Sequence, residues 1–137
     1  MKINAYLVFS GQCEEAFQLY AKVLGGKIEA MIRHEGTPAE SQVPAEWRSK
    51  IMHAYLTVNG ESIMGSDAPP AHATKPAGFS VSVTVTDPNE AERIYRGLVE
   101  GGTERMPIQQ TFWSPKFGML VDRFGIPWMI NTAPATA

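Results

Sequence analysis

Cysteine is almost absent from this sequence, whose 137 residues include only Cys13. A single thiol cannot form an internal disulfide or a cysteine metal cluster, which agrees with a reducing compartment. Cys13 falls in the first turn of a predicted helix, so we interpret it as a small structural residue.

Long hydrophobic runs and an excess of charge of one sign are also missing. No segment approaches the ~20 apolar residues that a transmembrane helix requires, and segment 1–11 is too short and too polar for a signal peptide. The 12 basic and 14 acidic residues give a formal net charge of −2, with no basic surplus to neutralise phosphates or lipid headgroups. We therefore expect a cytoplasmic protein that binds neither nucleic acid nor membrane.

The composition that is present is that of a globular domain. Hydrophobic residues make up 44% of the chain and charged residues 19%. A chain of 137 residues lies in the range of one domain with one core, and either half would be marginal alone. We predict a single domain over residues 1–137.

Two predicted helices share one motif. Apolar residues recur at helical spacing over 12–24 and again over 88–100, and a Gly-Gly pair follows each segment as a stop signal. Tyr20 and Tyr95 occupy the same place in the two segments, 75 positions apart (95 − 20). This agreement indicates that one helical unit occurs twice.

Strand-like segments surround each helix in the same order. One extended segment precedes each helix and three follow it, with the alternation or the apolar runs that are typical of strands. The predicted strands are 3–9, 27–33, 51–58, 62–66, 79–85, 105–110, 117–121 and 126–131.

The two copies differ in length after the helix. Gly60 and Gly125 mark equivalent hairpins 65 positions apart (125 − 60), so the first copy contains about ten more residues between its helix and its last hairpin. The extra residues fall in segment 36–47, which is rich in Pro, Ser, Ala and Glu. We predict a long surface loop there.

The repeat predicts an α+β fold of two tandem βαβββ modules. Module one covers 1–67, a proline-rich linker covers 68–77, and module two covers 78–133. A sheet with a helix on one face leaves the other face uncovered. We expect the two sheets to curve into a mixed half-barrel, with the helices outside and a cleft for a small molecule.

Four segments that together cover nearly the whole chain carry a family resemblance. They are YLVFSGQCEEAFQLYAKVLGG, IMHAYLTVNGESIMGSD, GFSVSVTVTD and MPIQQTFWSPKFGMLVDRFGIPWMIN. With them the chain resembles the PhnB-like subgroup of the vicinal-oxygen-chelate superfamily, which includes glyoxalase I, extradiol dioxygenases and bleomycin-resistance proteins. The subgroup is also named 3-demethylubiquinone methyltransferase-like.

In metal-using relatives of this superfamily, four His, Gln or Glu side chains from the first and last strands of each module hold a divalent ion. Carrying those positions over by aligning the helices and hairpins gives Ala5, Met64, Ser80 and Met129. None of these holds Mg²⁺, Mn²⁺, Fe²⁺ or Zn²⁺ tightly, although thioethers suit soft metals. We expect no metal cofactor and a mostly apolar pocket floor.

Polar side chains of module one complete the predicted pocket. His53 lies beside Tyr55 in a strand and is either a pocket base or ligand, or a structural histidine. Ser66 shares a face with Met64 by strand alternation. Asp67 is a candidate base, and it is equally well explained as a turn residue.

Residues of module two contribute a wall. Gln110 and Trp113 suit a pocket wall or lid, and the alternative is an aromatic core cluster followed by a turn. Trp128 should face away from Met129, under a helix.

The two remaining histidines lie outside module two. We interpret His34 and His72 as surface residues.

Two function classes remain open. The first is a binding module that holds an apolar or aromatic small molecule without a metal, as bleomycin-resistance proteins sequester their drug. The second is an enzyme, a lyase, isomerase or oxygenase that uses noncanonical metal ligands or His53 as a base. We do not expect a methyltransferase, because no glycine-rich cofactor loop follows the first strand.

Since relatives commonly pair modules across subunits, we expect a homodimer.

Overall fold

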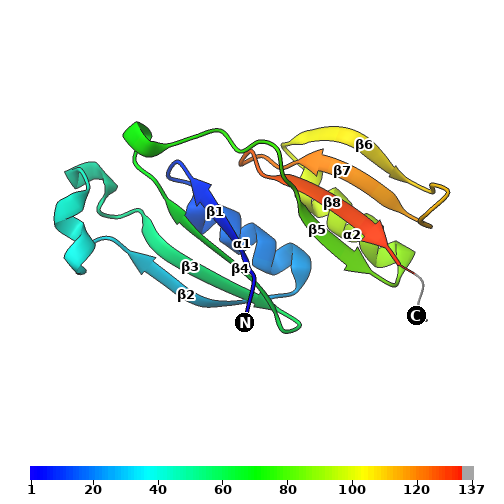
Figure 1. Ribbon diagram of the computed structural model, residues 1–137, viewed down its shortest axis with the longest axis horizontal. Helices are drawn as coiled ribbons and strands as arrows, with labels where there is room; N and C mark the ends of the chain where they lie inside the picture. Colours follow the sequence, from blue (N-terminus) through cyan, green and yellow to red (C-terminus); the bar gives the residue numbers. More distant parts are fainter. Residues whose placement is uncertain (134–137) are drawn as a thin grey trace. The chain divides into compact units, whose positions relative to one another are not determined.

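The computed structural model describes residues 1–133 of the chain. The chain divides into two compact units, Met1–Thr74 and Lys75–Ala137. Each unit contains one four-stranded sheet and one long helix (Figure 1). The hydrogen-bonded strand pairs all lie within one unit or the other, so each unit is described by itself.

The first unit has the order strand, helix and three strands. The strands lie side by side in the order β1-β4-β3-β2, with β1 parallel to β4 and the other pairs antiparallel. The elements are β1 (Ala5–Phe9), α1 (Cys13–Leu24), β2 (Lys27–Arg33), β3 (Ile51–Val58) and β4 (Glu61–Asp67). The predicted loop between β2 and β3 contains two short 3₁₀ helices, η1 (Pro38–Gln42) and η2 (Ala45–Trp47), and a third, η3 (Pro70–His72), follows β4.

The second unit repeats this connectivity. Its strand order is β5-β8-β7-β6, again with one parallel pair, β5 with β8. The elements are β5 (Val81–Val85), α2 (Pro88–Val99), β6 (Thr103–Gln109), β7 (Phe117–Val121) and β8 (Pro127–Thr132). The prediction of an α+β fold built from two tandem βαβββ modules is confirmed.

The two helices begin differently and end with the same kind of residue. At α2 the Asp87 side chain accepts a hydrogen bond from the Asn89 amide at 2.9 Å, with Pro88 in the first turn. At α1 the residue before the helix, Gln12, makes no side-chain cap. Gly25 and Gly101 follow the helices at φ of 70° and 77°, a conformation that costs glycine little.

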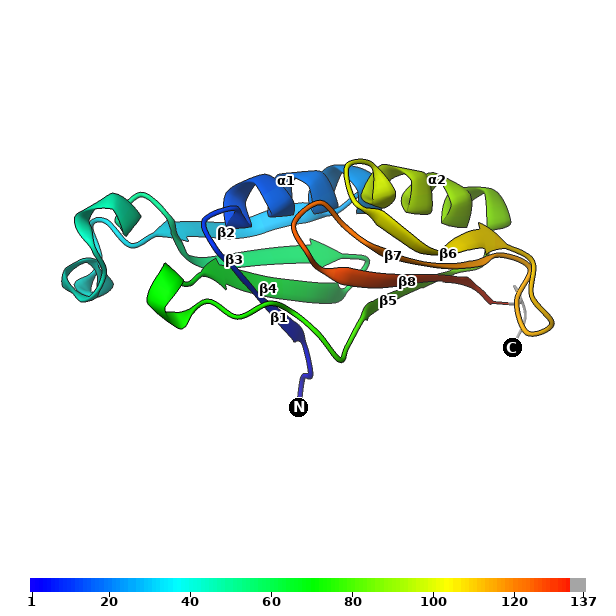
Figure 2. The same ribbon diagram turned by 90° about the horizontal axis from the view of Figure 1, so that it is seen from above.

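Each helix covers one face of the sheet in its own unit (Figure 2). Alternate strand residues are buried beneath it, together with the apolar side of the helix. Gly65 lies under α1, where an added Cβ would come within 2.8 Å of the Phe17 ring and of the Leu7 carbonyl. The largest fully buried side chains include Leu7, Phe17, Tyr20 and Leu56 in the first unit and Tyr95, Leu98, Leu120, Trp128 and Ile130 in the second.

The burial of Trp128 confirms the predicted orientation of β8. Its ring is fully buried, and its indole N–H donates a hydrogen bond to Asp122 Oδ2 at 2.9 Å.

Over residues 1–133, no helix is long and apolar enough to cross a membrane.

Candidate functional site

Two rows of side chains cross the face of the first sheet that points away from α1. Residues paired between neighbouring strands project to the same side, and the strand register aligns Tyr6 with Met64 and Met64 with Tyr55. A second row, one step along the strands, consists of Val8, Ser66, His53 and Ile32. We call these seven residues the helix-free face of the first sheet.

Large apolar side chains on this face are exposed within the described structure. Tyr6 retains 47% of its accessible surface, Val8 42% and Ile32 39%. His53, Tyr55, Met64 and Ser66 are partly exposed. Four predicted pocket residues, His53, Tyr55, Met64 and Ser66, are therefore brought together on one face, beside Tyr6, Val8 and Ile32, which the sequence analysis did not identify.

Tyr6 and His53 form a polar contact on this face. The Tyr6 hydroxyl lies 3.4 Å from His53 Nδ1, and the two rings stack with centroids 6.0 Å apart and planes 26° apart. The residues belong to β1 and β3, with β4 between them. The contact restrains one side of the imidazole, and it leaves Nε2 as the nitrogen that a ligand could engage.

The predicted register of the first strand was wrong by one residue. Ala5 pairs with Ile63, which puts it on the side of the sheet that α1 covers, while Tyr6 pairs with Met64. In the second sheet the partner of Met129 is Ser82, and Ser80 lies just before β5 on the same side as Ser82 by alternation.

The turn between β1 and α1 is one residue longer than the turn between β5 and α2, and this difference explains the wrong register. Helix α1 starts four residues after Phe9, at Cys13, whereas α2 starts three residues after Val85, at Pro88. The helices are therefore offset by 75 positions (88 − 13), and the preceding strands by 76 (85 − 9). An alignment based on the helices alone therefore misaligns β1 and β5 by one residue. A shift of one residue along a strand assigns each side chain to the opposite face of the sheet.

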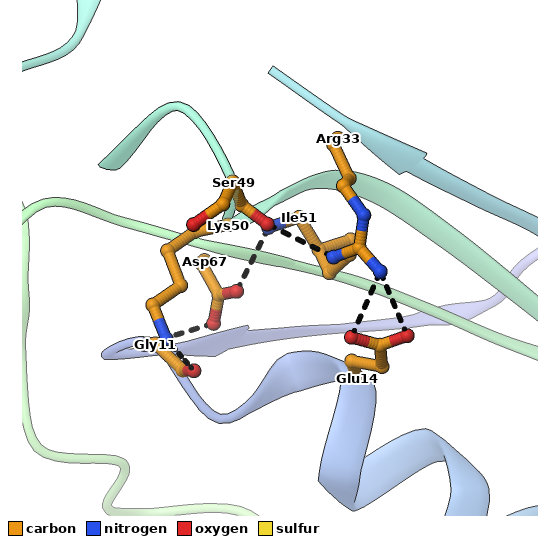
Figure 3. Close-up of polar contacts among 7 residues, drawn as sticks. All are labelled: Gly11, Glu14, Arg33, Ser49, Lys50, Ile51 and Asp67. Atoms are coloured by element: carbon orange, nitrogen blue, oxygen red, sulfur yellow. Dashed lines mark hydrogen bonds and ion pairs between the residues drawn. The ribbon is translucent and has the colours of Figure 1, made fainter. Parts of the chain in front are cut away.

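Asp67 lies on the other side of the sheet from His53. Its side chain is at the start of α1 (Figure 3). Its side chain is buried, and Oδ1 accepts hydrogen bonds from the amides of Gly11 at 2.9 Å and Cys13 at 3.0 Å. Oδ2 accepts one from the Ile51 amide at 2.9 Å. Asp67 therefore serves as the missing N-terminal cap of α1 and fixes the start of β3.

Two basic side chains join other groups near this end of the first unit (Figure 3). Lys50 donates from Nζ to the Gly11 carbonyl at 3.2 Å. Arg33 binds both carboxylate oxygens of Glu14, at 3.2 and 3.1 Å, and donates to the Ser49 carbonyl at 2.9 Å. These contacts tie the loop before β3 to the first turn of α1, so this end of the first unit is structural.

The Cys13 thiol is fully buried beside this cap. Burial, reinforced by the nearby charges of Asp67 and Glu14, raises the pKa of the thiol well above its ordinary value. The interpretation of Cys13 as a structural residue agrees with this environment.

The predictions for the two unassigned histidines had different outcomes. His72 is exposed, as predicted. The prediction for His34 was wrong, because its ring is buried and Nδ1 lies 2.9 Å from the Lys50 carbonyl. A residue at the end of a strand followed by a long loop gave no sequence signal that this loop folds back onto it.

Gln110 and Trp113 lie in the second unit, around an open depression of about 510 Å³ formed by residues 110–115 and Pro88. Phe112 is 96% exposed and Trp113 is 51% exposed, with their rings edge to face at 4.7 Å. The loop itself is fixed, since the buried Ser114 hydroxyl contacts the Lys116 and Thr132 carbonyls at 2.8 and 2.9 Å. Gln110 and Trp113 thus share one surface of the second unit.

The residues at the metal positions of the superfamily do not fit a hard divalent ion. With the observed register these positions correspond to Tyr6, Met64, Ser82 and Met129. A phenol, two thioethers and a hydroxyl offer neither carboxylate nor imidazole. In the part of the chain that the structure describes, no three His, Cys, Asp or Glu side chains gather closely enough to hold a metal.

Comparison with known proteins confirms the family assignment. The family model described as 3-demethylubiquinone-9 3-methyltransferase matches residues 1–131. The protein PA1353 from Pseudomonas aeruginosa is 44% identical, with a TM-score of 0.89 over 98% of both chains. A structure described as a putative 3-demethylubiquinone-9 3-methyltransferase, PhnB protein, from Bacillus cereus is 27% identical, with a TM-score of 0.82 over 97% of this chain and 100% of the other.

The fold is also shared with a protein of much lower sequence identity. A glyoxylase/bleomycin resistance protein/dioxygenase domain from Frankia superposes with a TM-score of 0.64 over 97% of each chain, at 14% identity, which is a likeness of fold alone. The match over residues 1–131 and the similarity of fold together show that the chain belongs to the PhnB-like 3-demethylubiquinone-9 3-methyltransferase family, built on the vicinal-oxygen-chelate fold.

Proposed function

We propose that this protein binds a small apolar or aromatic molecule on the helix-free face of its first sheet, without a divalent metal. The observation that carries the proposal is the exposure of Tyr6, Val8 and Ile32 on one face. Adjacent exposed apolar side chains on a regular sheet are typical of a surface that a ligand or partner covers. The aromatic ring of Tyr6 offers a stacking surface for a flat molecule.

Polar groups on the same face would orient such a molecule. His53 and Ser66 are the hydrogen-bonding side chains of the second row, and His53 is held from one side by Tyr6. A few polar groups within an apolar surface are the usual composition of a small-molecule site. The proposed ligand therefore combines an apolar or aromatic body with one hydrogen-bonding group.

Ligand-observed NMR with a set of neutral aromatic compounds tests this proposal. Replacing Tyr6 with Ala should weaken binding roughly tenfold, because the stacking surface is lost. Phe79→Ala is the matched control, since Phe79 is also 47% exposed but lies before β5 in the second unit. Equal losses in the two variants, or unchanged binding in Tyr6→Ala, would contradict the proposal.

Proton transfer by His53 is the second candidate function, and the Tyr6 contact is the observation that favours it. When Nδ1 carries the proton and donates to the Tyr6 oxygen, Nε2 is free to accept a proton from a bound molecule. Asp67 no longer supports this candidate, because its oxygens bind three backbone amides. The remaining candidate base is His53.

Turnover of a bound compound distinguishes the two candidates. A compound that binds should be incubated with protein and followed by proton NMR. Catalysis by His53 predicts conversion that is lost in His53→Gln while binding remains. Binding without conversion, or equal conversion by His53→Gln, would leave the binding function alone.

Methyl transfer, which the family name describes, has little support in the residues of this chain. The amides of Gly11 and Cys13 at the first strand-to-helix turn already bind Asp67. Such amides would otherwise be the groups that hold a cofactor phosphate or carboxylate. We expect no heat of binding when S-adenosylmethionine is titrated into the protein.

We also propose that the protein is a homodimer, as the family resemblance implies. Four strands, β1, β2, β5 and β6, lie at the ends of their sheets and carry unpaired backbone groups along one side. Sedimentation equilibrium would decide, with a mass near 30 kDa, twice the chain mass of 15.0 kDa, expected for the dimer. A concentration-independent mass of one chain would contradict it.

A further inference from the structure

Three methionines form a row across the second sheet. The register pairs Met106 with Met119 across β6 and β7, and Met119 with Met129 across β7 and β8. Paired residues project to the same side of a sheet. The neighbours Leu120 and Trp128 are buried on the α2 side, so Met119 and Met129 lie on the opposite face, which α2 does not cover. Met106 joins them through its pairing with Met119, which falls between two register shifts of β6.

The geometry of a sheet allows the three sulfurs to converge. Neighbouring strands lie about 4.8 Å apart, so the two outer methionines are separated by about 10 Å at the backbone. A methionine side chain has three rotatable bonds and adapts its shape readily. With Met119 in the middle strand, Met106 and Met129 can both bend toward a point above it.

All three methionines are partly exposed. By contrast, the Met52 sulfur in the first unit accepts a hydrogen bond from the Thr37 hydroxyl at 3.7 Å. Among residues 1–133, no comparable hydrogen-bond donor contacts the sulfurs of the row, so no such bond competes with a ligand for them.

We propose that the row of Met106, Met119 and Met129 is a binding site for a soft monovalent metal ion of the Cu(I) class. Thioethers are soft donors, and they favour Cu(I) over the hard divalent ions that carboxylates and water prefer. Three neutral donors leave the ion with its single positive charge, which a partly exposed site tolerates. This site lies wholly within the second unit and does not depend on the ligand proposed for the first sheet.

Silver ion provides a redox-stable probe for such a site. Protein with ¹³C-labelled methionine methyl groups is titrated with Ag(I) in a chloride-free buffer, and binding is measured in parallel by calorimetry. We expect one equivalent of Ag(I) to shift the methyl signals of Met106, Met119 and Met129 and to leave that of Met64 in place. Competition with a Cu(I)-specific chelator then extends the measurement to Cu(I).

The decisive variant is Met119→Leu, which conserves apolar volume and removes one sulfur. It should lower Ag(I) affinity at least tenfold. Met64→Leu is the matched control because Met64 is the counterpart of Met129 in the first sheet, where its cross-strand neighbours are Tyr6 and Tyr55 and not methionines. Its Ag(I) affinity should equal that of the wild type.

Two outcomes would overturn the inference. One is unchanged Ag(I) affinity in Met119→Leu, and the other is an Ag(I)-induced shift confined to methionines outside the row. If Met119→Leu proves unstable, Met129→Leu gives the same test from the neighbouring strand. Because leucine preserves an apolar surface, loss of metal binding in these variants leaves the aromatic-ligand assay on the first sheet unaffected, and the two proposals fail separately.

Discussion

The Oδ2 atom of Asp67 accepts a hydrogen bond from the backbone amide of Ile51 at 2.9 Å, and both residues are buried. The same carboxylate caps α1 through Gly11 and Cys13. One side chain at the end of β4 therefore joins the helix, the first β-α turn and the start of β3. Its loss should affect stability more than any surface change in the first unit.

Replacing Asp67 with Asn should lower the free energy of unfolding by about 2–4 kcal/mol, because one backbone amide then faces an NH₂ group in a buried place. Urea denaturation followed by circular dichroism measures the change. Asp87→Asn is the control, since Asn caps an exposed helix start as well as Asp does, and it should change stability by less than about 0.5 kcal/mol. Equal effects at the two positions would contradict the structural role assigned to Asp67.

The Cys13 thiol should be inert in the folded protein. Because burial raises its pKa, little thiolate forms in the native state, and the thiolate is the reactive species. Reaction with a chromogenic disulfide at pH 8 should be at least ~100-fold slower in buffer than in denaturant. Rapid reaction of the native protein would place the thiol in a more open environment.

The same shift predicts a loss of stability at alkaline pH. The folded pKa is raised above the unfolded value, so the contribution of the thiol to stability is complete below about pH 8.5 and declines as pH rises. Relative to Cys13→Ala, the wild type should lose about 2 kcal/mol of unfolding free energy between pH 8 and 10. Parallel curves for the two proteins over this range would show that the thiol does not contribute.

Gly65 sets the distance between α1 and the first sheet. A methyl group at this position would lie within 2.8 Å of the Phe17 ring and the Leu7 carbonyl, so Gly65→Ala should cost about 1–3 kcal/mol in denaturant unfolding. The double variant Gly65→Ala with Phe17→Leu should lose less than the sum of the single changes, because the ring edge is removed. Additive losses would mean that the backbone contact dominates.

The loop that precedes β7 should show a sharp contrast between Phe112 and Ser114, which are two residues apart. Ser114 is buried and its hydroxyl contacts two carbonyls, so Ser114→Ala should cost about 1–2 kcal/mol. Phe112 is 96% exposed, and Phe112→Ser should leave the thermal midpoint of unfolding nearly unchanged. A large loss from Phe112→Ser would reveal that the ring is covered in the assembled protein.

Much of the fold could be predicted because its signals are local. The boundaries of β2, β3 and β7 match the predicted strands, and the stops at Gly25 and Gly101 follow from a conformation that favours glycine. The repeat then indicated the order of elements in both units. Pattern and spacing were sufficient because each helix and strand is set mainly by its own residues.

The site was predicted less completely, because it depends on contacts between distant segments. A single-residue difference in the β-α turns decides whether Ala5 or Tyr6 lies beside Met64, and spacing within the helices carries no information about it. The role of Asp67 depends on Gly11 and Ile51, 56 and 16 positions away. Such long-range partners become visible only when the chain is folded.

The pairing of β1 with β4, and of β5 with β8, has a consequence for proteolysis. In the part of the chain that the structure describes, no ladder of backbone hydrogen bonds crosses from one unit into the other. Proteolytic cleavage between Thr74 and Lys75, in an exposed proline-rich stretch, would therefore cut the polypeptide without breaking a hydrogen bond between strands of either sheet. The cleaved halves would each keep their full set of strand partners, so reassembly of the two fragments offers a direct way to study how duplicated modules came to share one polypeptide.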